Sequence, residues 1–143
     1  MKKNRVQQKL LKSFMKGRMS ELELMMKENS QSVLAVVQSD SFWSLLLKTQ
    51  EYEKVAKWIN DKFPEYTHEM VSADDYNSFA QAAKQANIRA MKLTAALANG
   101  YIQEMISARG YLPFRNAVSN GHIEGIEFIA NLAGHAHIHE MIS

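Results

Sequence analysis

Apolar residues recur along the chain at helical spacing, and the apolar stretches are interrupted at regular places. Near the carboxyl end, Phe114, Ala117 and Val118 follow an i, i+3, i+4 pattern, and Asn120-Gly121 then interrupts it. This succession predicts a helix, a tight turn and a second helix, followed by a short helical linker. The predicted inner face of the second helix and the apolar positions of the linker are Ile123, Ile126, Phe128 and Ile129, then Ile138, Met141 and Ile142.

The same succession recurs every 35 or 36 residues. Three segments with a common pattern read HEMVS, QEMIS and HEMIS at residues 68–72, 103–107 and 139–143. Between them, the apolar positions from Tyr76 to Leu97 fall on those from Tyr111 to Leu132 at an offset of 35. A fixed period of this length is typical of repeat proteins, because each repeat is one supersecondary unit that buries its apolar face against its neighbours.

Two further copies precede these, with weaker matches. Apolar positions around Trp43 precede those around Phe79 by 36, and residues 16–25 match residues 120–129 position by position. We therefore expect an all-α solenoid of about four stacked helix-turn-helix repeats, forming a single domain over residues 1–143. The predicted units are residues 5–38, 39–73, 74–108 and 109–143. The first helices of the repeats carry small residues at Ala82, Ala83 and Ala117. Small side chains allow these helices to approach their neighbours closely.

The composition agrees with one globular domain and excludes several classes of site. The chain has 143 residues, of which 46% are hydrophobic and 22% charged, and it contains no cysteine. Disulfide frameworks, thiolate metal sites and a cysteine nucleophile are thereby excluded. The basic start leads into an amphipathic stretch, and no apolar run approaches a membrane-spanning length, so we expect a cytoplasmic protein without a secretory signal.

The fourth unit resembles the ankyrin-repeat family. Its residues 112–118 read LPFRNAV where that family has Thr-Pro-Leu-His-x-Ala-Ala, and residues 120–124 read NGHIE, which is similar to the Asn-Gly-His-Leu-Glu turn. The third unit keeps a weaker version at residues 77–83. The family's Gly-Ala-Asp-x-Asn hairpin is replaced by the recurring Glu-Met-Val/Ile-Ser segment, which has a helical pattern. Divergent repeats of this kind are similar to ankyrin segments in effectors of intracellular bacteria, and if this chain is such an effector, the resemblance implies delivery into a host cell.

The resemblance implies a function in binding a partner protein. Ankyrin-like proteins bind with the tips between repeats and with the exposed side of the first helices, and these parts should form one concave edge. The positions that correspond here are Asp40, Lys48, Asp74, Asp75, Tyr76, Lys84, Arg109, Tyr111 and Ser119. An alternative for Tyr76 and Tyr111 is that they recur because they pack on the neighbouring unit.

The first eighteen residues carry only positive charge. The seven basic residues before the first acid are Lys2, Lys3, Arg5, Lys9, Lys12, Lys16 and Arg18. Apolar residues interleave with them at helical spacing, so one interpretation is the solvated face of a first helix. The other is a surface for phosphates or anionic lipid, which makes nucleic-acid or membrane binding through Lys2–Arg18 the main alternative function.

The candidate metal and catalytic motifs are incomplete. His135 and His139 are spaced i and i+4 beside Glu140, but a helix would direct His137 away from them, so we predict no metal site. His68-Glu69 and its last copy lack the second histidine of the zinc-protease motif. No phosphate-binding loop appears, and no nucleophile, base and orienting group can be assembled.

We therefore predict a non-catalytic protein-binding module without a cofactor. A third alternative is the scaffold fragment of a larger effector or enzyme. The pattern closes with the HEMIS segment and no polar final helix, so we also expect either a piece of a longer protein or self-association through the carboxyl-terminal unit. The partner, the organism and the oligomeric state are not specified by the sequence.

Overall fold

Every regular element of the described chain is helical. The computed structural model describes residues 5–39 and 41–142, and these ranges contain no strand. The all-α prediction is confirmed. The chain divides into two compact units, Met1–Met70 and Val71–Ser143, so the division falls close to the predicted boundary between the second and third repeats. The single domain over residues 1–143 stays a prediction.

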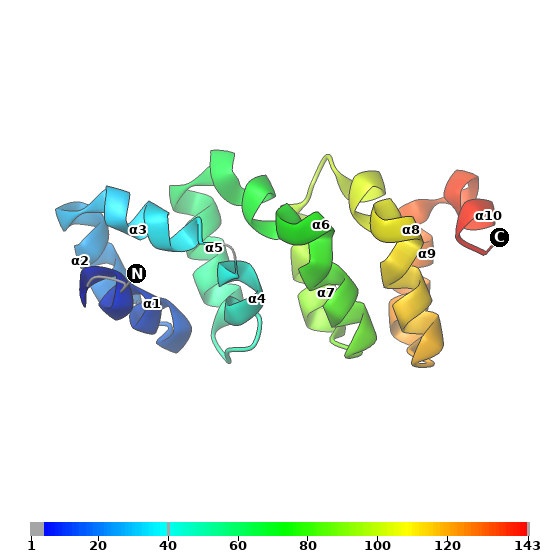
Figure 1. Ribbon diagram of the computed structural model, residues 1–143, viewed down its shortest axis with the longest axis horizontal. Helices are drawn as coiled ribbons and strands as arrows, with labels where there is room; N and C mark the ends of the chain where they lie inside the picture. Colours follow the sequence, from blue (N-terminus) through cyan, green and yellow to red (C-terminus); the bar gives the residue numbers. More distant parts are fainter. Residues whose placement is uncertain (1–4, 40, 143) are drawn as a thin grey trace. The chain divides into compact units, whose positions relative to one another are not determined.

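The first unit contains two helical hairpins, α1–α2 and α4–α5 (Figure 1). The elements are α1 (Arg5–Lys16), α2 (Met19–Glu28), α3 (Ser30–Val37), α4 (Phe42–Leu46), α5 (Tyr52–Lys62), the 3₁₀ turn η1 (Pro64–Tyr66) and the start of α6 (Thr67–Lys84). The first three helices pack on one another. This arrangement follows from the amphipathic pattern of α1, which buries Leu10 and Phe14 and leaves its lysines in solvent.

Aromatic side chains join the two hairpins of the first unit. The Phe14 ring lies edge-on to Phe42 with 5.0 Å between ring centroids, and edge-on to Trp58 at 6.0 Å. Trp43 is 3% exposed and Trp58 is 8% exposed, so both tryptophans belong to the core. The indole N–H of Trp58 reaches Glu23 Oε1 at 2.5 Å, which gives this buried side chain the hydrogen-bond acceptor it requires.

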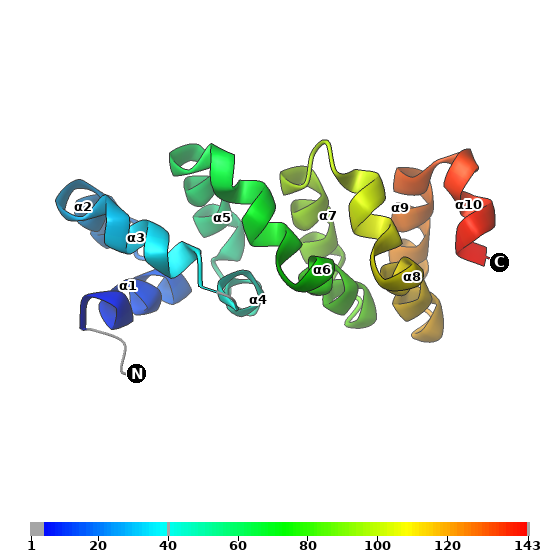
Figure 2. The same ribbon diagram turned by 45° about the horizontal axis from the view of Figure 1, so that its top comes forward.

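The second unit also contains two hairpins. The third hairpin is formed by residues 77–84 of α6 and by α7, and the fourth by residues 112–119 of α8 and by α9. Their bounds are α7 (Ile88–Leu97), α8 (Ile102–Ser119), α9 (Ile123–Ala133) and α10 (His135–Ile142). The second half of α8 and α9 lie side by side in both views (Figures 1 and 2). The predicted close-packing positions are buried, with Ala83 and Ala117 at 0% exposure.

The same turn closes the first, third and fourth hairpins. Gly17, Ala86 and Gly121 have φ values of +65°, +59° and +63°. In each turn this residue's N–H bonds back to the carbonyl three residues earlier, and the next N–H bonds to the carbonyl five residues earlier. This hydrogen-bond pair ends a helix at a left-handed residue, where glycine has no steric penalty.

A less common turn interrupts α6 and α8 at equivalent positions. Asp74, Asp75 and Tyr76 have φ near +55° and ψ between 33° and 50°, and the residues 35 positions later repeat these values. Three successive left-handed residues cost about 1–2 kcal/mol each without glycine, so the surrounding contacts must hold them in place. The break directly follows the predicted helical linker, residues 68–72 and 103–107, which lies in the first part of α6 and of α8. Pro113 lies in the first turn after the break, where its missing N–H costs nothing.

One core prediction was wrong. Ile123, predicted on the inner face of the fourth hairpin, is 68% exposed. The buried side of α9 passes instead through Gly125, Ile129 and Ala133, which are spaced by four residues. Ile123 is the first residue of α9, on a different side of the helix, and Ile126 and Phe128 are half-buried. Glycine at 125 was not recognised as an inner position because it has no side chain to show an apolar pattern.

Candidate interaction surface

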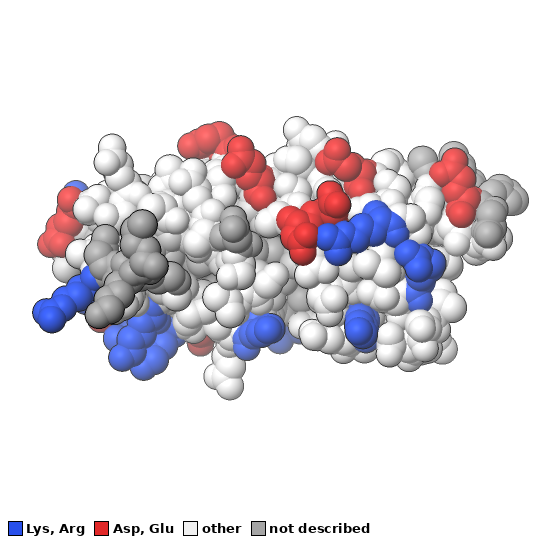
Figure 3. Space-filling model, viewed as in Figure 1, with Lys and Arg blue, Asp and Glu red and all other residues white. Residues whose placement is uncertain are grey.

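The two breaks bring predicted surface residues from successive hairpins together. Arg109 Nη2 lies 2.6 Å from Asp74 Oδ1, and Arg109 Nε lies 3.8 Å from Asp75 Oδ2. Positions 74 and 109 are equivalent in the repeat, so the pair joins the same point of consecutive units. Acidic and basic side chains adjoin over α6 and α8 in Figure 3. Because all three side chains stay substantially exposed, the ion pairs add little stability and leave charged groups facing solvent.

Arg115 belongs to this cluster, and the sequence analysis missed it. Its Nε donates to the Gly110 carbonyl at 3.0 Å and its Nη2 donates to the Arg109 carbonyl at 2.9 Å. The Arg115 guanidinium therefore stabilises the left-handed turn that positions Arg109. The only signal in the sequence is Gly110, which permits a positive φ but does not indicate which side chain will bind the turn.

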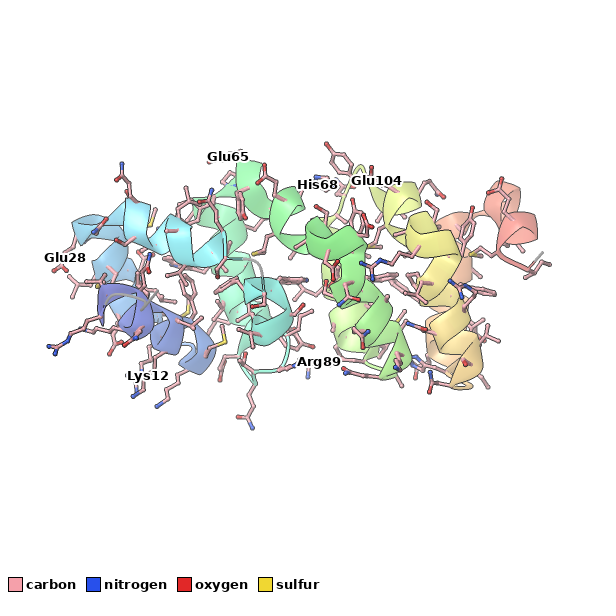
Figure 4. All side chains as sticks on the ribbon, in the orientation of Figure 1. Lys12, Glu28, Glu65, His68, Arg89 and Glu104 are labelled. Atoms are coloured by element: carbon pink, nitrogen blue, oxygen red, sulfur yellow. The ribbon has the colours of Figure 1, made fainter. Side chains whose placement is uncertain are left out.

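The recurring tyrosines bond to the recurring Glu-Met-Val/Ile-Ser segment at the end of their own repeat. The Tyr76 hydroxyl donates to Glu104 Oε2 at 2.7 Å, and the Tyr111 hydroxyl donates to Glu140 Oε2 at 2.5 Å. Burial, together with the bond to Glu104, raises the pKa of Tyr76. The bond to Glu140 raises the pKa of Tyr111. Figure 4 labels Glu104 on the first half of α8.

These contacts change the interpretation of the two tyrosines as binding residues. Tyr76 is only 4% exposed, so it offers almost no surface to a partner. Tyr111 is half-buried and keeps part of its ring accessible. The alternative, that the tyrosines recur because they pack on the neighbouring unit, stays a prediction, since both hydroxyl bonds lie within one predicted repeat.

Two further side chains bond to main-chain carbonyls of neighbouring helices in the second unit. Asn116 Nδ2 donates to the Ala80 carbonyl at 3.0 Å, across 36 positions of sequence. Gln103 Nε2 donates to the carbonyl of Leu132 at 3.2 Å. Since each bond satisfies a main-chain carbonyl of the neighbouring helix, the relative position of these helices is set by polar as well as apolar contacts.

The remaining predicted residues do not join this cluster. Lys84 and Ser119 are exposed at the turns that close the third and fourth hairpins, at the other end of the first helices. An eight-residue helix separates them from the breaks by about 12 Å. In the compact unit Val71–Ser143, the predicted single edge is therefore two separate rows of residues, one at the breaks and one at the hairpin turns. Lys48 is exposed in the first unit, and Asp40 lies outside the described residues.

The basic residues of α1 form a second candidate surface. Arg5, Lys9, Lys12 and Lys16 are all exposed and share one side of α1, apart from its buried residues Leu10 and Phe14. Lys12 points away from the helix in Figure 4. None of the four has a salt bridge among residues 5–39 and 41–142, whereas Arg18 Nη1 lies 3.7 Å from a carboxylate oxygen of Glu21. Lys2 and Lys3 lie outside the described residues.

The described residues contain no candidate metal centre. No group of three or more histidine and carboxylate side chains converges within that part of the chain. The side chains of His135, His137 and His139 lie outside it, so the prediction on this cluster stays a prediction. No helix that the structure describes is both long and apolar enough to cross a membrane.

Comparisons with protein-family models, with curated proteins and with solved structures find no significant match to this chain.

Proposed function

We propose that the chain is a non-catalytic protein-binding module, built as a solenoid of about four ankyrin-like helical repeats. The observation that carries the proposal is the recurrence of one structural device. Both Tyr76 and Tyr111 follow two other left-handed residues, and each bonds to a glutamate 28 or 29 positions later. A device repeated at the sequence period supports a repeated structural unit, and the Arg109–Asp74 and Asn116–Ala80 bonds support contact between successive units.

The binding surface that we propose is the charged cluster at the breaks together with the exposed row at the hairpin turns. Its residues are Asp74, Asp75, Arg109, Arg115, Lys84 and Ser119. Hydrogen bonds hold Arg109 and Arg115 in fixed positions before any partner arrives. Fixed side chains lose less conformational entropy on binding, and charges of both signs favour a partner with a complementary mixed pattern.

The experiment that tests this proposal compares three forms of the purified chain as bait in cell lysate. The surface form carries Asp75→Lys and Lys84→Glu. The control form carries Lys92→Glu and Glu127→Lys, which lie exposed on the second helices of the same hairpins. Both forms keep the net charge of the wild type, and circular dichroism verifies their helical content.

A protein captured by the wild-type and control forms but not by the surface form would support a binding module that uses this surface. Equal capture by all three forms would contradict the assignment of the surface. Capture of no protein by any form would contradict the proposed function.

A second candidate function is binding of nucleic acid or of an anionic membrane through α1. The observation that favours it is the row of Arg5, Lys9, Lys12 and Lys16, which has no salt bridge within the described residues. Binding to duplex DNA or to phosphatidylserine vesicles would weaken steeply with salt, because each neutralised phosphate releases a counterion. Lys9→Gln with Lys12→Gln should weaken it further, and Lys92→Gln should not.

A further inference from the structure

The chain contains two Asn-Gly pairs, Asn99-Gly100 and Asn120-Gly121, and each lies in a turn between two helices. In such a pair the main-chain nitrogen of the glycine can attack the side-chain amide carbon of the asparagine, and a glycine has no side chain to obstruct the attack. The attack requires a glycine N–H that can lose its proton and an asparagine side chain that can turn toward it. Hydrogen bonds to either group therefore protect the pair.

The pair that closes the fourth hairpin is protected at both groups. The Asn120 Nδ2 donates to the Asn116 carbonyl at 2.8 Å, and the Gly121 N–H donates to the Val118 carbonyl at 3.0 Å. The second of these bonds belongs to the hydrogen-bond pair that ends α8, so the release of the Gly121 nitrogen requires local opening of that helix end.

The pair in the turn between α7 and α8 has neither protection. Asn99 and Gly100 are exposed, and within residues 5–39 and 41–142 neither the Asn99 side chain nor the Gly100 N–H makes a hydrogen bond. A Cβ added at Gly100 would meet no atom within 4 Å, so no neighbouring group shields the glycine on that side. The turn projects from the ends of its two helices (Figures 1 and 2).

We propose that Asn99 is a site of spontaneous deamidation in the folded chain, and that Asn120 is protected from the same reaction. The Gly100 nitrogen loses its proton and forms a bond to the Asn99 Cγ, and the side-chain nitrogen takes up a proton and leaves as ammonia. Water then opens the resulting succinimide ring at one of its two carbonyls, which gives either aspartate or isoaspartate. The reaction consumes one water and releases one ammonia, and it needs no enzyme, cofactor or oxidant.

The reaction changes both the charge and the main chain of this turn. Either product carries a carboxylate at position 99, so the formal net charge falls by one, from +2 to +1. The new charge lies just beyond the end of α7 at Leu97, beside the negative end of the helix dipole. Isoaspartate also adds one main-chain atom between Ala98 and Tyr101, whose carbonyl and N–H bond across the turn at 2.8 Å.

This site is separate from the residues of the proposed binding surface, so the two proposals can fail independently. Deamidation at Asn99 would produce a second, more acidic form of the chain as the protein ages. Isoaspartate should also weaken the turn between α7 and α8, because the lengthened main chain no longer fits the bond between Ala98 and Tyr101.

Peptide mapping by mass spectrometry tests the proposal. The folded chain and the same chain unfolded in guanidinium chloride are incubated in parallel at neutral pH, until half of Asn99 has converted in the unfolded sample. Trypsin cleaves after Lys92, Arg109 and Arg115, so the two pairs fall in different peptides, residues 93–109 and 116–143. The mass increase of each peptide measures its deamidation, and fragment ions identify the asparagine that has reacted.

In the folded chain we expect Asn99 to deamidate at least about tenfold faster than Asn120, because two hydrogen bonds must break before Gly121 can attack. In the unfolded chain the two rates should be similar, since both pairs have the same residues and neither is held by a turn. The rate at Asn99 should rise with pH, because the attacking nitrogen must lose its proton.

The matched variants are Asn99→Gln and Asn120→Gln, which keep a side-chain amide but would require a larger ring that forms more slowly. Isoelectric focusing should show the more acidic form accumulating in the wild type and in Asn120→Gln, but not in Asn99→Gln. Circular dichroism verifies that both variants fold.

Three results would overturn the proposal. The first is a folded chain in which Asn99 deamidates no faster than Asn120. The second is a ratio of the two rates that unfolding leaves unchanged, because the difference would then belong to the local sequence rather than to the turns. The third is hydrogen exchange in which the Gly100 amide is as strongly protected as the Gly121 amide.

Discussion

The Tyr76 hydroxyl donates to Glu104 at 2.7 Å, and this bond joins the start of the third hairpin to the segment that leads into the fourth. Tyr76 is buried, whereas Tyr111, which makes the equivalent bond to Glu140, is half-buried and its bond is exposed. The two tyrosines therefore form a natural pair for measuring what burial adds to one hydrogen bond.

Tyr76→Phe should lower the free energy of unfolding by about 1 kcal/mol, because it removes a bond from a buried hydroxyl to a carboxylate. Tyr111→Phe should change it by less than Tyr76→Phe does, since water replaces the lost partner. Urea denaturation of both variants measures the difference. Equal losses in the two variants would show that burial of the ring does not strengthen the bond.

Tyr76 should also ionise late in an alkaline titration. Burial and the bond to Glu104 raise its pKa above the ordinary value of 10.0. A raised pKa in the folded state means that the bond stabilises the fold below pH 10 and that this contribution is lost as the pH rises through the folded pKa. Absorbance at about 295 nm follows phenolate formation. We expect the last-titrating tyrosine to disappear in Tyr76→Phe and to remain in Tyr111→Phe.

Ala86→Gly should stabilise the second unit. Ala86 has a φ of +59° at the position where the other two turns of this type have glycine. Relief of the left-handed strain outweighs the entropy that glycine adds to the unfolded chain, so we expect a gain of up to about 1 kcal/mol. The control is Ala96→Gly, an exposed position inside α7, which should lose about 0.5–1 kcal/mol. Thermal and urea unfolding measure the stability of both variants. A loss of stability in Ala86→Gly would contradict the proposed strain at Ala86.

At one repeat position, substitutions in the two breaks should change the stability of the fold in opposite directions. Gly110 and Asp75 are equivalent and have φ values of +64° and +52°. An alanine Cβ at position 110 would come no nearer than 3.9 Å to the Arg115 side chain, so the cost of Gly110→Ala is the backbone strain, about 1 kcal/mol. Asp75→Gly should stabilise by a similar amount, because its ion pair with Arg109 is exposed and 3.8 Å long. Denaturant midpoints that move in the same direction for both variants would contradict this account.

Glu23 should make the first unit sensitive to acid. Hydrogen bonds from Lys62 and from the Trp58 indole lower the pKa of Glu23 below its ordinary value of 4.5. A lowered folded pKa stabilises the fold above pH 4.5, and this contribution is lost as the pH falls through the folded pKa. Glu23→Gln keeps an acceptor for the indole and removes the charge. Its stability should therefore fall less steeply than that of the wild type below about pH 5, as followed by urea midpoints and Trp fluorescence.

Several structural features could be predicted from the sequence because they depend on local pattern. Helical spacing and turn residues predicted helices and turns in the right places around Gly17 and Gly121. The recurring Glu-Met-Val/Ile-Ser segments were predicted as helical, and they lie in helices. The inner face of α9 was predicted less well, because Gly125 and Ala133 give a weak apolar signal and Ile123 a strong one.

The candidate surface was predicted only in part. Asp74, Asp75 and Arg109 were chosen because of their repeat positions, and the structure brings them together. Tyr76 was chosen for the same reason but is buried. Arg115 was missed because its partners are main-chain carbonyls of a left-handed turn, and that turn has no distinctive sequence beyond one glycine.

The sequence by itself determined the period of 35 or 36 residues and the helical character of the chain, because both follow from the spacing of apolar residues and turns along the chain. The tertiary structure decided which equivalent side chains are buried and which are exposed. Phe79 and Phe114 occupy the same repeat position and share the same residue type, yet one is fully buried and the other is half-buried. Burial depends on whether another hairpin adjoins the face, and this neighbour is a property of the folded chain rather than of the local pattern.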